Sequence, residues 1–466
     1  MPFFNGYQAF LHGLKWYFWL KFQHMFKRVL AKIGKDEQFK DLISGSSVVV
    51  LFRVAGMGAG YIFTLLIARE MGAEVTGIYQ TVFTVVSLAV TFARLGLGQA
   101  SVRFIAEARG EKNLAKGQRV YSLASRTVSF TSFLFGGIIF FLSPWLAMKF
   151  ENPEIENALR AGAVSIPFMT FTSLNADVMR GMRKMTAFAI LQNGTLKFLE
   201  SAVLALVIYL GYTDATTAIW VMVASFGVWA LLSFVFRFRY FPMQNRAESD
   251  FPLKSLLQVG FPLLLSGAMF MIMSWADVLI LSYFRPESEV GVYSIAYKVS
   301  ILITIPLFAI NSMAGPKFSQ FKGAGDMKNL LKVAKQSAKL NFITSFPIFV
   351  GVMALAGFLM NLFGDEFAGG TSLLYVLALG QLYNASCGSV LNLLNMTGHE
   401  RKVQRIIVIS TLVNLILNIL VAGEYGAMGV SITTAISLLL WNTLGMITVK
   451  RVYGFWMFPN PFKPVG

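Results

Sequence analysis

The residues best able to do chemistry in this chain are charged side chains inside long apolar runs. Arg53 lies ten residues into the first run that could cross a membrane, and Lys197 lies eleven residues into the fifth. At 1.5 Å per residue, both lie roughly 15 to 16 Å from the end of the run. A charge at that depth costs at least about 2.5 to 3.5 kcal/mol on insertion scales. We therefore expect each cation to be paired, to reach the membrane surface, or to contact a substrate.

The surrounding sequence gives different possible partners to the four cations in the apolar runs of the first half. Glu200 follows Lys197 by three residues, so a local ion pair on one helix is the alternative to substrate contact. Arg53 has no acid three or four residues away, which favours a position facing a cavity. Arg94 and Arg126 lie within roughly two turns of a span end, so each can either reach lipid headgroups or enter the cavity.

The second half of the chain contains two further candidate residues, Asp277 and Lys298. Asp277 and Lys298 fall at matching depth, roughly 10 to 12 Å from the opposite edge, on neighbouring antiparallel spans. The sequence therefore predicts an interhelical ion pair. The alternative is that Asp277 acts alone and couples transport to H+ or Na+.

The intramembrane charges differ between the two halves. The first half has four cations and two anions, a net charge of +2, and the second half has one of each. The residues counted are Arg53, Arg94, Arg126, Lys197, Asp177 and Glu200, against Asp277 and Lys298.

The composition is that of an integral membrane protein. Hydrophobic residues make up 56% of the chain and charged residues only 14%, with a mean hydropathy of +0.62, whereas soluble domains carry roughly 25% charged residues. The net charge of +17 comes from cations between the apolar runs, which argues against nucleic acid as a partner. One cysteine and three scattered histidines predict neither a disulfide nor a metal site, and no nucleotide-binding loop or enzyme motif is present. We therefore predict a protein without enzyme activity or cofactor that is driven by an ion gradient, the membrane potential or product consumption.

The apolar runs predict twelve transmembrane helices. They cover 43–68, 76–100, 121–146, 158–181, 186–211, 215–237, 256–284, 290–314, 338–363, 371–396, 403–423 and 427–449. An even number of spans puts both termini on one side of the membrane. If the N-terminus is cytoplasmic, the only Lys and Arg residues on the outer side are Arg69, Lys149, Arg160 and Arg285. This asymmetry predicts a multi-pass protein of the cell (inner or cytoplasmic) membrane with both termini inside.

The chain also looks duplicated. Gly77-Ile-Tyr79 recurs as Gly291-Val-Tyr293, 214 residues later and at the same point of the hydropathy pattern. Six spans per copy predict two parallel lobes around a central cavity. The predicted units are a basic amphipathic cytoplasmic segment at 1–41, lobes at 42–240 and 255–452, a linker at 241–254 and a tail at 453–466. For 1–41, a partly ordered tail is the alternative to a surface helix.

Small residues mark the first span. Gly56, Gly58 and Gly60 give it a small face, which we interpret as a site of close helix packing, with a moving hinge as the alternative.

Two segments resemble a known family. Leu66-Ile-Ala-Arg-Glu-Met-Gly72 with Gly77-Ile-Tyr79, and later Asp277-Val-Leu-Ile-Leu with Gly291-Val-Tyr-Ser-Ile-Ala-Tyr-Lys298, are similar to segments of polysaccharide and O-antigen (Wzx-type) flippases. That family belongs to a superfamily with multidrug extruders and the lipid II flippase. The resemblance implies two six-helix lobes and alternating access of a cavity that carries a polyprenyl-diphosphate-linked oligosaccharide outward.

The resemblance and the excess of cations together predict a flippase for polysaccharide biosynthesis. Its expected partners are the lipid-linked glycan, membrane lipids, and a polysaccharide polymerase or glycosyltransferases. A cation-coupled multidrug exporter of the same fold is the first alternative, and a scaffold that recruits glycosyltransferases through the basic segment is the second. Predicted substrate contacts are Arg53, Lys197, Arg94 and Arg126, with Asp277 and Lys298 as a coupling or structural pair.

Overall fold

The fold consists of long helices, with no strand in the parts of the chain described. The computed structural model describes residues 37–192, 195–241 and 250–457. The predicted surface segment at 1–41 and tail at 453–466 therefore lie largely outside the described residues.

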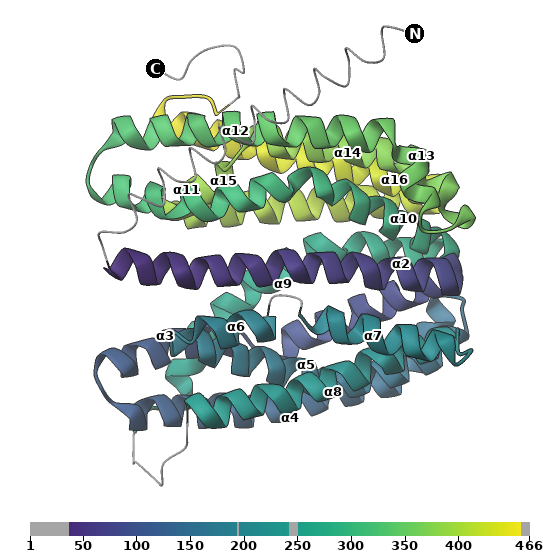
Figure 1. Ribbon diagram of the computed structural model, residues 1–466, viewed down its shortest axis with the longest axis horizontal. Coiled ribbons are helices and arrows are strands. Elements are labelled where there is room, and N and C mark those ends of the chain that lie inside the picture. Colours follow the sequence, from purple (N-terminus) through teal and green to yellow (C-terminus); the bar gives the residue numbers. More distant parts are fainter. Residues whose placement is uncertain (1–36, 193–194, 242–249, 458–466) are drawn as a thin grey trace, which may run out of the picture.

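The first lobe contains seven labelled helices (Figure 1). They are α2 (Glu37–Ala93), α3 (Leu97–Gly110), α4 (Leu114–Lys149), α5 (Glu154–Gly181), α6 (Met185–Gln192), α7 (Leu196–Tyr209) and α8 (Ala215–Tyr240). The second lobe contains α9 (Leu253–Phe284), α10 (Glu287–Ser300), η1 (Ile301–Thr304), α11 (Ile305–Gly323), α12 (Met327–Ala354), α13 (Ala356–Asn361), η2 (Asp365–Gly370), α14 (Thr371–Cys387), α15 (Val390–Met396) and α16 (Glu400–Tyr453).

Two of these helices are hairpins of two spans. α2 turns at Gly72 (φ 86°) and α16 turns at Gly426 (φ 53°), backbone conformations that favour glycine. The rings of Phe63 and Tyr79 are 5.2 Å apart, although sixteen residues of straight helix would separate them by roughly 24 Å. The chain therefore reverses direction within each of these two helices.

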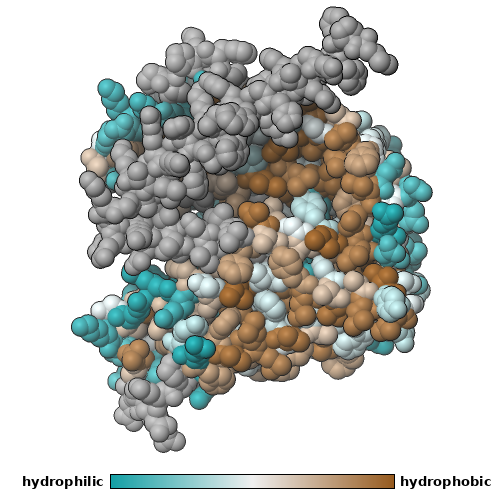
Figure 2. Space-filling view, in the orientation of Figure 1, coloured by the Kyte–Doolittle hydropathy of each residue, from teal (hydrophilic) through white to brown (hydrophobic). Residues whose placement is uncertain are grey.

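With these reversals counted, each of the twelve predicted spans falls on a helix or a helix pair. Seven helices of the described chain are long and apolar enough to cross a membrane, and the bent α9 makes eight. Splitting α2 and α16 adds two, and the more polar α5 and the pair α14–α15 complete the set. Figure 2 shows hydrophobic residues across the middle of the molecule and hydrophilic residues at its left and right ends, as expected for a membrane-spanning bundle.

Polar caps fix the short connections at both ends. The Asn113 side chain accepts a hydrogen bond from the backbone N–H of Lys116 (3.0 Å) at the start of α4, and the Asp214 carboxylate caps α8 in the same way. We call the end that carries Asn113 the basic end, which is the predicted cytoplasmic side, and the end that carries Asp214 the acidic end.

The lobes exchange segments across their boundary. α2 and α9 lie between them in Figure 1. Ala68 and Ala73, beside the α2 turn, are buried in the core of the second lobe. Leu256, in the first half of α9, is buried in the core of the first lobe. α9 bends by 54° between Leu253–Met269 and Ser274–Phe284, so one helix contacts both bundles.

Candidate functional site

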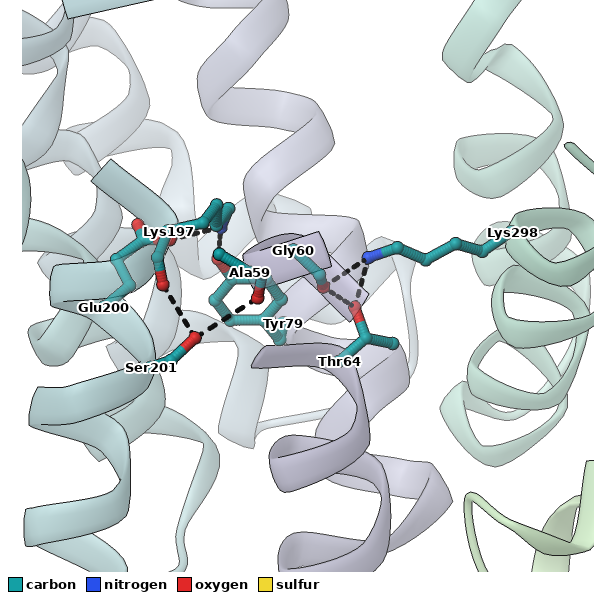
Figure 3. A network of polar contacts seen from close by, with 8 residues as sticks. All are labelled: Ala59, Gly60, Thr64, Tyr79, Lys197, Glu200, Ser201 and Lys298. Atoms are coloured by element: carbon teal, nitrogen blue, oxygen red, sulfur yellow. Dashed lines mark hydrogen bonds and ion pairs between the residues drawn. The ribbon is translucent and has the colours of Figure 1, made fainter. Parts of the chain in front are cut away.

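The central polar site lies where α2 of the first lobe meets α10 of the second. The Lys298 ammonium donates to the Gly60 carbonyl (3.0 Å) and to the Thr64 hydroxyl. In return, the Tyr61 hydroxyl donates to the Lys298 carbonyl (2.7 Å). Figure 3 shows the Lys298 side chain reaching α2 from the second lobe. Lys298 is therefore held by neutral acceptors across the boundary between the lobes.

The predicted ion pair between Asp277 and Lys298 does not form. Asp277 accepts instead from Tyr293 (2.9 Å) and Thr434 (2.7 Å). Lys298 is five residues beyond Tyr293 on the same helix, a rotation of roughly 140°. When Tyr293 faces Asp277, Lys298 must therefore point elsewhere, and equal depth in the membrane was not sufficient for pairing.

Asp277 is surrounded by neutral donors. Besides Tyr293 and Thr434, the Asn418 amide donates to its carboxylate at 2.5 Å. The same Asn418 amide nitrogen also donates to the Asn414 side-chain oxygen at 3.3 Å. Asp277 is 6% exposed, and no cation forms an ion pair with it within the described chain. Such a carboxyl can take up a proton, or hold a small cation with nearby hydroxyl and amide oxygens.

Lys197 forms the local ion pair that was its alternative. Its ammonium contacts the Glu200 carboxylate one turn along α7, and Glu200 is fully buried. It also donates to the Tyr79 hydroxyl at 3.3 Å and lies 4.2 Å from the centroid of the Phe63 ring. The charge of Lys197 is therefore balanced within the first lobe.

Arg94 and Arg126 differ from each other. Arg94 contacts Asp177 of α5 at 2.6 Å, and Arg180 contacts the same carboxylate at 3.0 Å. Arg94 is thus paired with an acid, which neither of its two predicted alternatives included. Arg126 is exposed on α4, on the same face as the exposed Phe130, and α4 lies at the outer edge of the first lobe (Figure 1).

Arg53 keeps its charge without an acid. Its guanidinium carbon lies 3.6 Å from the centroid of the Phe308 ring on α11, a cation–π contact between the lobes. The side chain is exposed, and no acid forms an ion pair with it in the described part of the chain. Gly58 and Gly60 follow on α2, and a Cβ atom at either would meet nothing within 4 Å. The predicted close packing at these two glycines is therefore wrong, and they border open space.

Near the acidic end, the duplicated glycines form a contact between the lobes. A Cβ atom at Gly77 would lie 1.8 Å from the Glu287 carbonyl oxygen, and one at Gly291 would lie 2.1 Å from that of Ala73. Glu287 is 214 residues after Ala73, as Gly291 is after Gly77. The contact therefore has the two-fold symmetry of the duplication. Thr81 also donates to the Glu287 carboxylate at 2.9 Å.

A cavity of about 570 Å³ opens beside this contact, at the acidic end. Its lining includes Glu289 and Glu366, but both carboxylates already bind backbone N–H groups. Glu366 accepts from Ala73 (2.8 Å) and Glu289 from Ala427 (2.6 Å), just after the two turn glycines. These acids therefore cap helices and are not free for a ligand.

A family model now identifies the chain. The model described as "Polysaccharide biosynthesis protein" matches residues 42–322, more than half of the sequence. The chain belongs to the polysaccharide biosynthesis protein family. A second model, MatE, matches residues 262–420.

Curated relatives of this chain include two proteins of Haloferax volcanii. A "Probable low-salt glycan biosynthesis flippase" is 30% identical over 168 residues, 35% of each chain. A "Probable flippase" is 27% identical over 244 residues, 52% of this chain and 48% of the relative. The chain thus spans about a third and about half of the lengths of these relatives.

Solved structures confirm the fold. An inward-facing multidrug resistance MATE family transporter aligns with a TM-score of 0.71 at 17% identity, over 84% of this chain and 94% of that one. The lipid II flippase MurJ, in an inward closed conformation, aligns with a TM-score of 0.70 at 15% identity, over 88% and 87%. The predicted all-α polytopic fold is therefore confirmed. The curated relatives and the solved structures are named as flippases or transporters, which are not enzymes.

Several residues of the site were not found from sequence. Asn414, Asn418 and Thr434 around Asp277, and Thr64 beside Lys298, carry no charge and stand out in no motif. The repeated tyrosine was the available signal, because Tyr79 and Tyr293 each bind a charged group of the site.

Proposed function

We propose that this protein is an alternating-access flippase that moves a polyprenyl-diphosphate-linked oligosaccharide from the cytoplasmic to the outer leaflet. The observation that carries the proposal is the pair of cations without acidic partners at the lobe boundary, Arg53 and Lys298. Lys197 and Arg94 are neutralised by Glu200 and Asp177, which leaves these two cations to meet an anion between the lobes.

Their placement suits a diphosphate. Arg53 and Gly60, which binds Lys298, are seven residues apart on α2, so they share one face at a separation of roughly 10 Å along the axis. The open space at Gly58 and Gly60 lies on this segment. A diphosphate has several charged oxygens, and an arginine fork can engage two of them. The two cations come from opposite lobes, so such a ligand would contact both.

Cation coupling is proposed at Asp277. Its carboxylate, with the hydroxyl oxygens of Tyr293 and Thr434 beside it, offers a site for H+ or Na+ in the second lobe. Exchange of that cation would supply the energy that the chain cannot obtain from nucleotide. The flippase would act in the cell membrane with both termini in the cytoplasm, beside the polymerase or glycosyltransferases that handle its glycan.

The multidrug exporter remains the second candidate because the fold is shared. Cationic drugs would favour acids between the lobes, whereas Asp277 is already bound by three neutral donors and Arg53 and Lys298 are cations. Efflux of a cationic dye that is lost in Asp277→Asn and retained in Arg53→Ala would favour this candidate instead.

The test of the flippase is glycan export in cells at matched membrane abundance of each variant. Arg53→Ala should weaken substrate binding by roughly 1.5 to 3 kcal/mol, or about 10- to 150-fold, because one charge-assisted contact is lost. Arg53→Lys should be partly active because the charge remains and the fork is lost. Arg126→Gln is the matched control and should export normally. Wild-type export by Arg53→Ala would overturn the assignment of Arg53.

A further inference from the structure

The surroundings of Lys197 have the composition of an ammonium-binding site. The Lys197 nitrogen lies 4.2 Å from the centroid of Phe63, 5.7 Å from that of Phe83 and 5.8 Å from that of Tyr79. Aromatic faces attract cations through their quadrupole, and several rings around one point form a cage for an ammonium group. The carboxylate of Glu200 supplies the countercharge. Three rings and a buried carboxylate are more than a local pair on a helix requires.

The cage joins three spans of the first lobe. Phe63 comes from the first arm of the α2 hairpin, Tyr79 and Phe83 come from the second, and Lys197 and Glu200 come from α7. Ser201, next to Glu200, also donates to the Ala59 carbonyl at 3.3 Å. Figure 3 shows Lys197, Glu200 and Ser201 on one side of α2 and Lys298 reaching it from the other. The ammonium is thus bound at the junction of α7 with both arms of the hairpin.

The duplication places this cage opposite Asp277. With the offset of 214 residues, Phe63 corresponds to Asp277, and Tyr79 to Tyr293. Tyr79 accepts a hydrogen bond from the Lys197 ammonium, whereas Tyr293 donates one to the Asp277 carboxylate. Glu200 likewise corresponds to Asn414, which lies beside Asn418. The two lobes therefore keep the tyrosine and carry opposite charges beside it.

We propose that Phe63, Tyr79, Phe83 and Glu200 form a site for a primary ammonium ion, which the chain fills with its own Lys197. The first lobe is then a permanently occupied copy of a cation site, and only the second lobe keeps an exchangeable one. The comparison with the second lobe rests on the proposed coupling at Asp277, whereas the cage itself does not. Lys197 accordingly holds α7 to the α2 hairpin and does not contact the glycan lipid.

The experiment is chemical rescue of Lys197→Ala in the purified full chain. Alanine removes three carbons and the ammonium nitrogen, which together are propylammonium, and the Lys197 side chain is 25% exposed, so a small amine can enter. Thermal unfolding is measured against propylammonium concentration, with 1-propanol as the uncharged analogue. We expect a saturable rise in Tm of roughly 2 to 4 °C with propylammonium, little change with 1-propanol, and none in the wild type. No saturable rise, or an equal rise with 1-propanol, would overturn the proposal.

Two variants act as controls. Lys197→Ala with Glu200→Gln should lose the response because the countercharge is gone. Lys184→Ala should show none, because the Lys184 nitrogen lies over one ring, that of Tyr240 at 5.1 Å, and forms no ion pair within the described chain. An equal response in either control would refute the cage.

Folding in cells provides a second measurement. If Lys197→Ala is not stable enough to purify, its membrane abundance in cells grown with and without propylammonium replaces Tm, and unchanged abundance counts against the cage. Both readouts are independent of glycan transport. A protein that responds to propylammonium but exports no glycan would therefore contradict the proposed flippase and support the cage.

Discussion

At the scale of single residues, the electrostatics of this membrane protein depend on which charges are neutralised by neighbours. Removing one member of a buried pair leaves an uncompensated charge, which is far costlier than removing both. Lys197 and Arg94 have such partners in Glu200 and Asp177, so their loss is expected to affect stability first. Arg53 contacts an aromatic ring and Lys298 contacts neutral oxygens. Such contacts can be exchanged for an anionic ligand.

The first residue-scale prediction concerns Asp277 and Lys298. Because they bind separate groups, the effects of Asp277→Asn and Lys298→Met on glycan export should add in free energy to within about 0.5 kcal/mol. The measurement is a double-mutant cycle at matched membrane abundance. If the double mutant exports clearly more glycan than Asp277→Asn alone, the two charges do compensate each other.

At the scale of elements, glycines determine where helices turn and where they touch. Gly72 and Gly426 reverse the chain inside α2 and α16, and Glu366 and Glu289 bind the N–H groups that follow these turns. Gly77 and Gly291 have a different role, because the absence of a Cβ atom lets α2 and α10 meet backbone to backbone. This contact closes the lobes against each other near the acidic end. A protein whose cavity opens alternately to the two sides of the membrane must break this contact.

The second prediction follows from that contact. Gly77→Leu should keep α2 and α10 apart, because its Cβ atom would lie 1.8 Å from the Glu287 carbonyl oxygen. Thr81 is buried, so a cysteine there reports whether this contact has opened. In a Cys387→Ala, Thr81→Cys parent, adding Gly77→Leu should raise the rate of labelling by a membrane-impermeant maleimide roughly 10-fold.

Gly58→Leu is the matched control, because a Cβ atom there meets nothing within 4 Å. Its labelling rate should equal that of the Thr81→Cys parent. Equal rates in Gly77→Leu and the parent would show that the glycine contact does not control access from the acidic end.

At the scale of the whole molecule, two lobes are tied together by shared elements. Ala68 and Ala73 beside the α2 turn are buried in the core of the second lobe, and Leu256 in the first half of α9 is buried in that of the first. The first connection lies at the acidic end and the second toward the basic end, and the contact of Lys298 with Gly60 of α2 is a further link between the lobes. Rocking of the lobes about this site would open one end while the other stays closed.

The third prediction is the orientation of the molecule in the membrane. Reporters fused after Asn152 or Asp365 should be external, and reporters after Asn113, Ala247 or Lys328 should be cytoplasmic, because the basic loops remain inside. Activity of a periplasm-dependent reporter, such as an alkaline phosphatase, compared with that of a cytoplasmic one decides each position. An external signal after Ala247 would contradict the division into six and six spans.

The sequence by itself determined the membrane class and the helical spans, because hydropathy is a local property of the chain. The division into two duplicated lobes stays a prediction from the repeated motif. The sequence also contained the pair of Lys197 with Glu200, since residues three apart on a helix are neighbours. Contacts between helices were decided only by the tertiary structure, because they depend on the rotation of each helix as well as on depth. Lys298 binds α2 instead of Asp277, and Arg94 contacts Asp177 on a helix that no sequence spacing connects to it.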